Sequence, residues 1–307
     1  MKRYIITGAT SFLGKELIQY LSSLPNVEIY AVCRPGKGIW NSSNIQTIEA
    51  DMEEYHKLYE KINQADVFIN LAWSGTGHEG RNIASIQEEN IRNTLNAIHS
   101  AKKIGCQLFV ESGSQAEYGD IPTIIDETCP CNPFTEYGKA KLIVQKEAFR
   151  LSEELNIKYI HLRIFSLFGE NDHPWTLVSM CVDKMLNNET IHLSTCSQYW
   201  NFLYVKDAVM QIYKLCEYAD QNDKFCHDVY NIASRDTRKL KDFVEEIKAI
   251  TKSNSPLDFG RITPVRNISL RPSIEKLENT IGFIEKYSFK DAIRNIIKNR
   301  STTQKEH

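Results

Sequence analysis

The sequence has no apolar run that approaches the roughly 18 consecutive residues of a membrane-spanning helix. We also expect no cleavable signal, because Met1-Lys-Arg leads directly into the strand-like run Tyr4–Thr7. We therefore expect a cytoplasmic protein with no membrane partner.

An excess of charge is missing as well, since 37 Lys and Arg oppose 39 Asp and Glu, for a net charge of -2. This balance gives no sign of a nucleic-acid partner and favours small-molecule chemistry.

The sequence also lacks a cysteine pattern that would hold a metal. Its eight cysteines are scattered, and the one close pair, Cys129 and Cys131, has neither a second pair nor histidines at ligand spacing. We expect reduced structural thiols and no metal site.

Short β-branched and apolar runs alternate with helical patterns through the first half of the chain. The predicted strands are Tyr4–Thr7, Glu28–Cys33, Ile45–Glu49, Asp66–Ala72, Gln107–Ser112 and Tyr159–Arg163. This alternation predicts an α/β fold with a Rossmann-like, doubly wound parallel sheet. We expect a dinucleotide-binding domain over residues 1–165, with a returning segment at about 202–235. Residues 166–201 and 236–307 break the alternation and are expected to form a smaller C-terminal substrate lobe.

The turn after the first predicted strand suits a dinucleotide pyrophosphate. In Gly8–Gly14, Gly8 allows a tight turn and Gly14 allows close packing of helix on strand, while backbone N–H groups and the positive helix end face the phosphates. Ser11 replaces the middle glycine of the usual pattern, so an ordinary strand–helix turn is the alternative. The candidate cofactor contacts here are Gly8, Thr10, Ser11, Phe12, Leu13 and Gly14.

The end of the second predicted strand carries Arg34, where a dinucleotide fold usually has an acid that binds the adenosine ribose. A forked, positively charged side chain suits a 2′-phosphate, so we expect NADP (NADPH) as the cofactor, with NAD possible. An arginine exposed in a loop is the alternative. Further candidate contacts follow the third and fourth strands: Asp51, Met52, Leu71, Ala72 and Trp73.

Tyr137 and Lys141 stand four residues apart at the start of a predicted helix, so they share one helix face. A phenol is a weak acid at neutral pH, but an adjacent ammonium favours the phenolate and lets it exchange a proton with a sugar hydroxyl or ketone. Ser114, after the fifth strand, supplies a candidate hydroxyl partner. Since open α/β sheets bind ligands at the carboxyl ends of their strands, we expect these three residues to be catalytic. An ordinary tyrosine and lysine are the alternative, because Tyr-x-x-x-Lys alone is common.

These motifs together resemble the extended short-chain dehydrogenase/reductase family, in its NAD(P)-dependent nucleotide-sugar epimerase/dehydratase group. The matching segments, in family order, are Gly8–Gly14, Asn70–Trp73, Asn90–Leu95, Ser114 with Tyr118–Gly119, Tyr137 with Lys141, Arg163–Gly169, Asn201–Asp207 and Tyr230–Ala233. The resemblance implies a nucleotide-sugar substrate, and it adds Asn90, Phe165, Tyr137 and Lys141 to the candidate cofactor contacts. It also implies a homodimer through the predicted helices at 83–104 and after Tyr137.

Three departures from the family pattern refine the expected reaction. Ser166 stands where sugar 4-epimerases usually have asparagine, Trp200 where many have arginine, and residues 114–118 lack the acidic set of 4,6-dehydratases. We expect an NADPH-dependent reductase of a nucleotide-linked keto sugar, preferably a 4-keto-6-deoxyhexose. The alternatives are an NAD-dependent nucleotide-sugar 4-epimerase and, from another class, a non-catalytic dinucleotide-binding regulator. The candidate diphosphate ligands in the lobe are Arg261, Arg266 and Arg271.

Overall fold

The computed structural model describes residues 1–38, 40, 42–77, 79–264, 266, 268–283 and 285–303, so the last four residues of the expected substrate lobe lie outside it. Its main feature is a seven-stranded sheet in the order β10-β6-β5-β4-β1-β2-β3. The strands are β1 (Lys2–Thr7), β2 (Val27–Cys33), β3 (Ile45–Glu49), β4 (Val67–Asn70), β5 (Leu108–Ser114), β6 (Lys158–Ile164) and β10 (His227–Ile232). Every pairing in this sheet is parallel, which confirms the predicted doubly wound fold.

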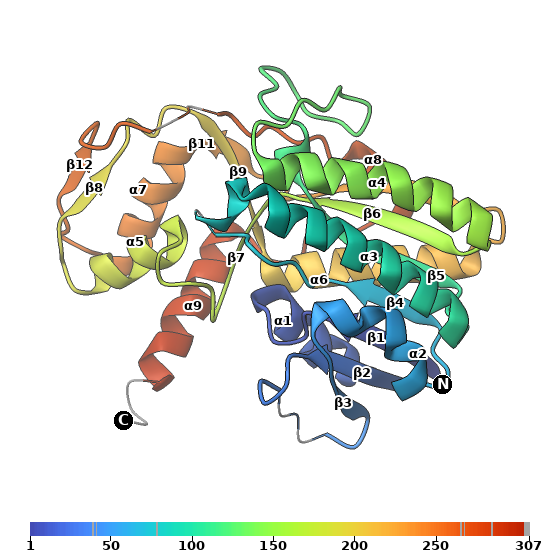
Figure 1. Cartoon of the computed structure of the whole chain (residues 1–307). Helices are drawn as coiled ribbons and strands as arrows, with labels where there is room; N and C mark the ends of the chain where they lie inside the picture. The colour runs from blue at the N-terminus through green and yellow to red at the C-terminus, as the bar shows by residue number, and fades with distance from the viewer. Residues whose placement is uncertain are drawn as a thin grey trace.

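Helices cover both faces of this sheet (Figure 1). One face carries α1 (Phe12–Ser22) and α6 (Val205–Gln221), and the other carries α2 (Leu58–Lys61), α3 (Ala84–Ile104) and α4 (Glu136–Leu155). Successive side chains of a strand point to opposite faces, so Ile6 joins the apolar core with Leu17, whereas Ile5 joins a second core with Phe68 and Ile98. The strand order reverses between β1 and β4, where ligands bind in such folds.

The second half of the chain adds a lobe with its own short strands. A three-stranded sheet has the order β11-β9-β7, from β7 (Ser166–Phe168), β9 (Tyr199–Tyr204) and β11 (Thr237–Lys239), and β8 (Ile191–Leu193) pairs with β12 (Leu257–Phe259). The sequence did not predict these strands, because all of them except the six-residue β9 are three-residue runs, which carry no clear period. The remaining helices are α5 (Leu177–Leu186), α7 (Leu240–Thr251), α8 (Glu275–Ile281) and α9 (Phe289–Thr303).

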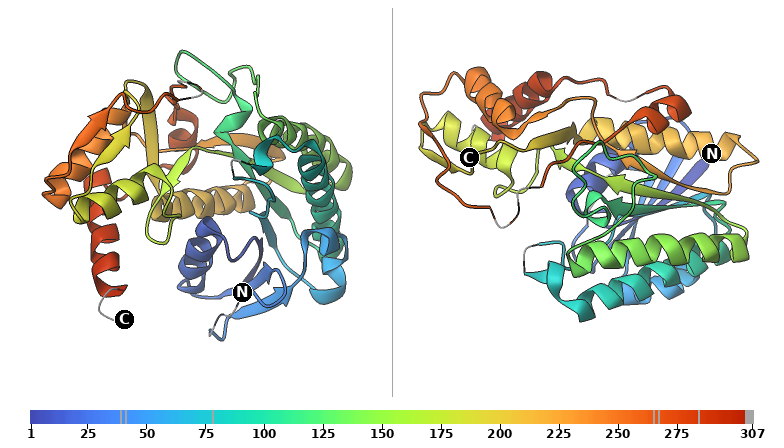
Figure 2. Two further views of the ribbon diagram at one scale, coloured as in Figure 1. Left: turned by 60° about the vertical axis from the view of Figure 1, so that its left-hand side comes forward. Right: turned by 90° about the horizontal axis from the view of Figure 1, so that it is seen from above.

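The chain returns to the main sheet through α6 and β10, while β9 stays in the lobe. Helix α8 packs on α6 and β10, whereas α5, α7 and α9 surround the lobe strands (Figure 2). The lobe therefore stands beside the carboxyl ends of the main strands. Within the described part of the chain, no helix is long and apolar enough to cross a bilayer, and no three His, Cys, Asp or Glu gather as a metal site.

Candidate active site

The turn between β1 and α1 has the geometry of a phosphate-binding loop. Gly8 has a φ of 63°, and a Cβ there would lie 2.8 Å from the Ala72 backbone nitrogen. A Cβ on Gly14 would lie 2.3 Å from the Gly8 carbonyl oxygen, so both positions require glycine. Ser11 caps α1, since its Oγ accepts a hydrogen bond from the Gly14 N–H at 3.0 Å. The cap explains why serine stands where the usual pattern has glycine.

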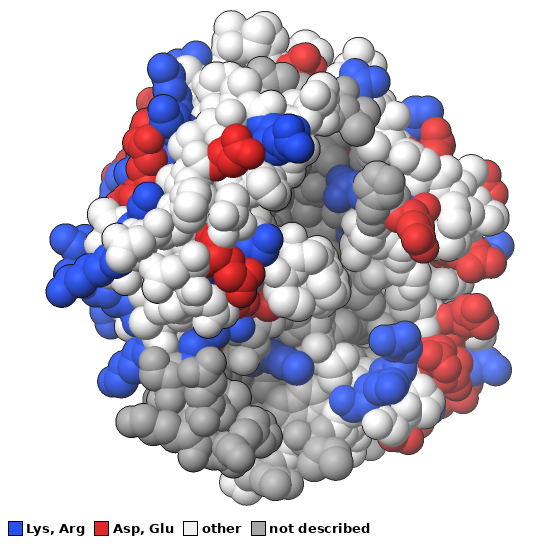
Figure 3. Space-filling view, turned by 90° about the vertical axis from the view of Figure 1, so that its left-hand side faces the viewer, with Lys and Arg blue, Asp and Glu red and all other residues white. Residues whose placement is uncertain are grey.

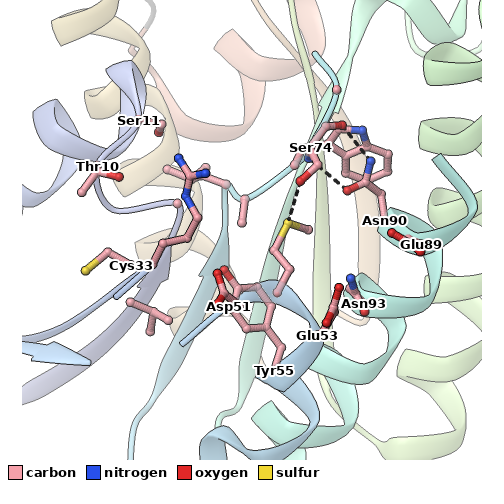
Figure 4. Close-up of a pocket in the computed structure, with 18 of the residues that line it drawn as sticks. Thr10, Ser11, Cys33, Asp51, Glu53, Tyr55, Ser74, Glu89, Asn90 and Asn93 are labelled. Carbon is pink, nitrogen blue, oxygen red and sulfur yellow. Dashed lines mark hydrogen bonds between the residues drawn. The ribbon is translucent and has the colours of Figure 1, made fainter. Parts of the chain in front are cut away.

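A cavity of about 660 Å³ lies in front of this turn, a size usual for small-molecule sites (Figure 4). Of the candidate cofactor residues, the cavity is lined by Gly8, Thr10, Ser11, Arg34, Asp51, Met52, Leu71, Ala72, Trp73 and Asn90. The lining also includes residues that the sequence did not single out: Val32, Cys33, Glu53, Tyr55, Ser74, Gly75, Ile86, Glu89 and Asn93. They lie on the strand ends and helix faces next to the predicted residues, where only the folded arrangement identifies them.

Other candidate cofactor residues do not line this cavity. Phe12 and Leu13 belong to the first turn of α1 and pack on the core, and Gly14 lies behind the loop. Phe165 is 4% exposed and packs beside Tyr118 in a small apolar cluster. Tyr137 lies beyond Trp73, at an edge-to-face distance of 6.0 Å between ring centroids.

Asn90 fixes the cavity wall through the backbone of Ser74. Its Oδ1 accepts from the Ser74 N–H at 3.0 Å, and its Nδ2 donates to the Ser74 carbonyl oxygen at 2.8 Å (Figure 4). The Ser74 hydroxyl in turn donates to Met52 Sδ at 3.6 Å. Asn90, a predicted cofactor contact on helix α3, therefore also holds the backbone of Ser74 in the cavity wall.

Arg34 stands on the opposite rim of the cavity from this wall, at the end of β2. Its side chain is exposed, and among the described residues no carboxylate lies within ion-pair distance of it. The neighbouring turn is held by Glu49, whose Oε1 accepts from the Gly36 N–H at 2.8 Å. An unpaired guanidinium at this rim can bind an anionic group of a ligand.

Helix α4 brings Tyr137 and Lys141 to the carboxyl end of β5. Thr135 caps the helix by accepting from the Gly138 N–H at 3.0 Å. A Cβ on Gly138 would lie 2.6 Å from the Ala116 carbonyl oxygen, so glycine here lets α4 approach the 3-10 helix η3 (Gln115–Glu117). Ser114 is the N-cap of η3, and its Oγ accepts from the Ala116 N–H at 3.2 Å. The Ser114 hydroxyl hydrogen is therefore left to donate elsewhere.

The Lys141 side chain is 1% exposed and its ammonium is held from three sides. Nζ lies 3.1 Å from Glu111 Oε1, donates to the Ser112 carbonyl oxygen, and lies 3.5 Å from the centre of the Trp73 ring. A second cation approaches the phenol, because the guanidinium carbon of Arg81, on η2 (Gly80–Asn82), lies 4.4 Å from the centre of the Tyr137 ring. Aromatic rings and cations thus alternate around the predicted catalytic tyrosine.

Two buried carboxylates behind these residues were not predicted. Burial raises the pKa of Glu111, although Lys141 and Asn70 act in the opposite direction. Burial would raise the pKa of Glu117 too, but His161 and Arg163 outweigh it and hold that pKa below its ordinary value. Glu117 Oε1 lies 2.9 Å from His161 Nε2, and its Oε2 accepts from Arg163 Nε at 2.9 Å.

The three arginines predicted for a diphosphate differ in surroundings. Arg266 stacks on Phe134 at 4.1 Å and Arg271 on Tyr199 at 4.8 Å, while Arg261 is exposed. Figure 3 shows the lobe side of the molecule hollowed, with Lys and Arg side chains around the hollow and Asp and Glu among them. Arg266 and Arg271 therefore contact different aromatic rings.

Comparison with known proteins finds relatives that cover most of the chain and a solved structure with the same fold. CDP-abequose synthase from Salmonella muenchen is 21% identical over 271 residues, covering 85% of this chain and 85% of that protein. The dTDP-4-dehydro-6-deoxyglucose reductase from Escherichia coli is 25% identical over 271 residues, covering 83% and 84%. The structure of UDP-glucose 4-epimerase from Thermotoga maritima with UDP-glucose matches at 18% identity with a TM-score of 0.86, covering 98% and 99% of the two chains, and it shows the same fold.

A family model provides the assignment. The model described as the NAD dependent epimerase/dehydratase family matches residues 4–233, which span the main sheet, the candidate cofactor cavity and α4. The chain therefore belongs to the NAD dependent epimerase/dehydratase family of NAD(P)-dependent enzymes.

Proposed function

We propose that this enzyme is an NADPH-dependent reductase of a nucleotide-linked keto sugar, preferably a 4-keto-6-deoxyhexose. The observation that carries the proposal is a cavity whose lining includes the exposed Arg34 and, through Trp73, adjoins Tyr137 and Lys141. The guanidinium suits a 2′-phosphate, which distinguishes NADPH from NADH. NADPH is the usual donor for biosynthetic reductions, so cofactor choice favours net reduction.

The chain's own residues suit the proton transfer that such a reduction requires. NADPH, when bound, supplies the hydride to the keto carbon. Tyr137 donates its phenolic proton to the former carbonyl oxygen, and Ser114 donates a hydrogen bond to the same oxygen. Lys141 favours the phenolate that remains. The product is the nucleotide sugar with a hydroxyl at the former keto carbon. The phenol regains its proton from solvent before the next cycle.

The relatives support this substrate class by their names. One is a reductase of dTDP-4-dehydro-6-deoxyglucose and another a CDP-abequose synthase, so enzymes of this family act on nucleotide-linked deoxysugars. In this chain Ser166 and Trp200 differ from the residues usual in 4-epimerases, and Trp200 packs half-buried against the apolar core. These departures favour reduction over epimerisation.

The test is to mix the purified protein with NADPH and a panel of nucleotide 4-keto-6-deoxysugars and to follow the nicotinamide absorbance. One mole of NADPH consumed per mole of sugar reduced supports the proposal. Interconversion of two sugar nucleotides by protein that retains NAD, with no net redox change, identifies a 4-epimerase instead. Cofactor binding without turnover across the panel identifies a regulator.

We further propose that two copies form a homodimer through the outer sides of α3 and α4. The two helices pack side by side, and Ile143 is 44% exposed on α4. Ile98 on α3 and Val144 on α4 are fully buried and are not part of this surface. A dimer mass in solution that falls to a monomer mass in Ile143→Glu supports the interface, and a wild-type monomer at micromolar concentration contradicts it.

A further inference from the structure

A row of polar side chains crosses the main sheet beneath α4. Register neighbours on β1, β4, β5 and β6 are Thr7, Asn70, Glu111 and His161, and each is 0% exposed. Asn70 joins the row, since its Oδ1 accepts from the Thr7 hydroxyl at 2.5 Å and its Nδ2 donates to Glu111 Oε2 at 2.7 Å. One Glu111 oxygen is thus fixed by the sheet, and the other accepts from Lys141.

The same face of the sheet is apolar two residues earlier along each strand. Phe68 and Phe109 stack with centroids 5.0 Å apart, and Phe109 and Tyr159 stack at 6.1 Å. The sheet therefore tolerates a packed apolar row at this depth. Burying a carboxylate and an ammonium costs several kcal/mol per ion before their attraction offsets it, so a buried ion pair is weak evidence for stability.

The buried Glu111–Lys141 ion pair is better explained by the role of Lys141 in the reaction than by a gain in stability. Lys141 is 1% exposed, and burying an ammonium without a counter-charge carries a large desolvation cost. The other nearby carboxylate, Glu117, is already engaged by His161, Arg163 and the Ser114 N–H. Within the described residues, Glu111 is thus the carboxylate that pairs with Lys141.

We propose that Glu111 is a positioning residue for the reaction. It is the counter-charge that holds the Lys141 ammonium beside the Trp73 ring, which in turn meets Tyr137 edge to face, at a place set by Asn70 and the strand register. Lys141 is then ready to act on the phenol before any ligand binds. This inference rests on the proposed function for its catalytic consequence, but the charge and place of the ammonium can be tested without a substrate.

A double-mutant cycle tests whether Glu111 acts through Lys141. Glu111→Gln keeps the shape and an acceptor for Asn70 but removes the charge, and we expect kcat to fall about tenfold or more with little change in KM. Lys141→Met should lower kcat further. The double variant should match Lys141→Met alone, because the carboxylate has nothing left to position. Independent losses that multiply in the double variant would overturn the inference.

Carbon-13 NMR of labelled lysine provides the substrate-free readout, since the Cε shift reports whether the amine is charged. The Lys141 signal, assigned by its loss in Lys141→Met, should be that of a charged amine in the wild type at neutral pH and should move toward the neutral form in Glu111→Gln. A neutral Lys141 in the wild type, or an unchanged charged signal in folded Glu111→Gln, contradicts the inference. If Glu111→Gln does not fold, a neutral Lys141 signal in the wild-type spectrum would still contradict the inference.

Glu136→Gln is the matched control. It removes a carboxylate from the exposed Lys139–Glu136 pair of the same helix, where Nζ and Oε1 are 2.7 Å apart. We expect its kcat and its Lys141 signal to equal those of the wild type. If no sugar is reduced by any form of the protein, the proposed function fails, whereas the NMR result still tests the placement of the ammonium.

Discussion

The two ends of the site are built in different ways. At the Tyr137 end, Ser114, Lys141 and Glu111 are all less than a tenth exposed and are held by side chains from neighbouring strands. At the Arg34 end, Arg34 and Asp51 are exposed and few contacts fix them. The geometry of the buried end is therefore fixed during folding, whereas the exposed end recognises charge, and salt screens that interaction. Changes at the Tyr137 end should alter turnover, or stability where the changed group is buried and paired, and changes at the Arg34 end should alter cofactor affinity alone.

The largest effect should come from Tyr137→Phe, which removes the proton donor and keeps the ring against Trp73 and Arg81. Turnover should fall by about 10² or more, while folding and cofactor affinity stay close to wild type. Steady-state kinetics and cofactor titration measure the two effects. Tyr59→Phe is the control, because Lys103 lies 4.2 Å from that ring in a similar contact far from the site. Full activity of Tyr137→Phe would remove the catalytic assignment.

Next in size is the effect of Glu117→Gln on stability, which should depend on pH. Since His161 and Arg163 hold the pKa of Glu117 below the ordinary 4.5, its charge stabilises the fold above that value, and this contribution is lost as pH falls through the lower, folded-state pKa. Removing a partner from a buried ion pair costs about 3–5 kcal/mol, so the variant should be destabilised at pH 7 by roughly that amount.

Urea unfolding midpoints measure this prediction at pH 7 and at successively lower pH. The difference between wild type and Glu117→Gln should shrink as the pH falls. Glu154→Gln breaks an exposed pair with Arg150 and should change stability by less than about 1 kcal/mol at either pH. A difference for Glu117→Gln that stays constant with pH would show that its charge is not the stabilising feature.

Gly113→Ala should be somewhat less damaging. A Cβ there would lie 2.2 Å from His161 Nε2 and 2.7 Å from Glu117 Oε1, inside a packed polar cluster. We expect a loss of about 1–3 kcal/mol in the free energy of unfolding, the usual range for overpacking. Gly77→Ala is the matched control, since nothing lies within 4 Å of its added Cβ. Equal unfolding midpoints for the two variants would mean that the buried end adapts as readily as the surface.

The effect of Arg34→Gln should be confined to the cofactor. The variant should lose about 1.5–3 kcal/mol of NADPH affinity with little change for NADH, and Arg34→Asp should erase or reverse the preference. The loss should diminish at high salt, because the guanidinium is exposed. Titrations with both cofactors at two salt concentrations measure it. Equal wild-type affinities for NADPH and NADH would leave Arg34 a surface residue.

The sequence predicted those features of the fold and the site that depend on residues close together in the chain. The Gly8–Gly14 turn and the Tyr137 and Lys141 pair follow from short motifs, and the alternation of runs gave the parallel sheet. The buried polar groups were missed because they meet across strands. Glu111 and His161 are adjacent only through the β5–β6 register, which a single sequence does not reveal. The sequence did contain one signal of these groups. Glu111 is a charged residue inside a strand that was expected to be buried on both faces, and a charged group in such a place must be paired.

The lobe was predicted least well for a related reason. Its strands are three to six residues long and pair with partners distant in the chain, as β8 with β12. Runs this short have no measurable period, so their pairing depends on tertiary packing. The position of Trp200 on β9, which distinguishes this chain from the usual family pattern, likewise became clear only from the packing around it.

The most direct test of the proposed reaction uses NADPH deuterated at the transferable C4 position of the nicotinamide, with a nucleotide 4-keto-6-deoxysugar. We expect one deuterium at the former keto carbon of the product for each NADPH oxidised, and we expect this deuterium transfer to be lost in Tyr137→Phe. Conversion of the sugar nucleotide without deuterium from the added cofactor would contradict it, because the hydride would then have been returned from a cofactor that never left the site.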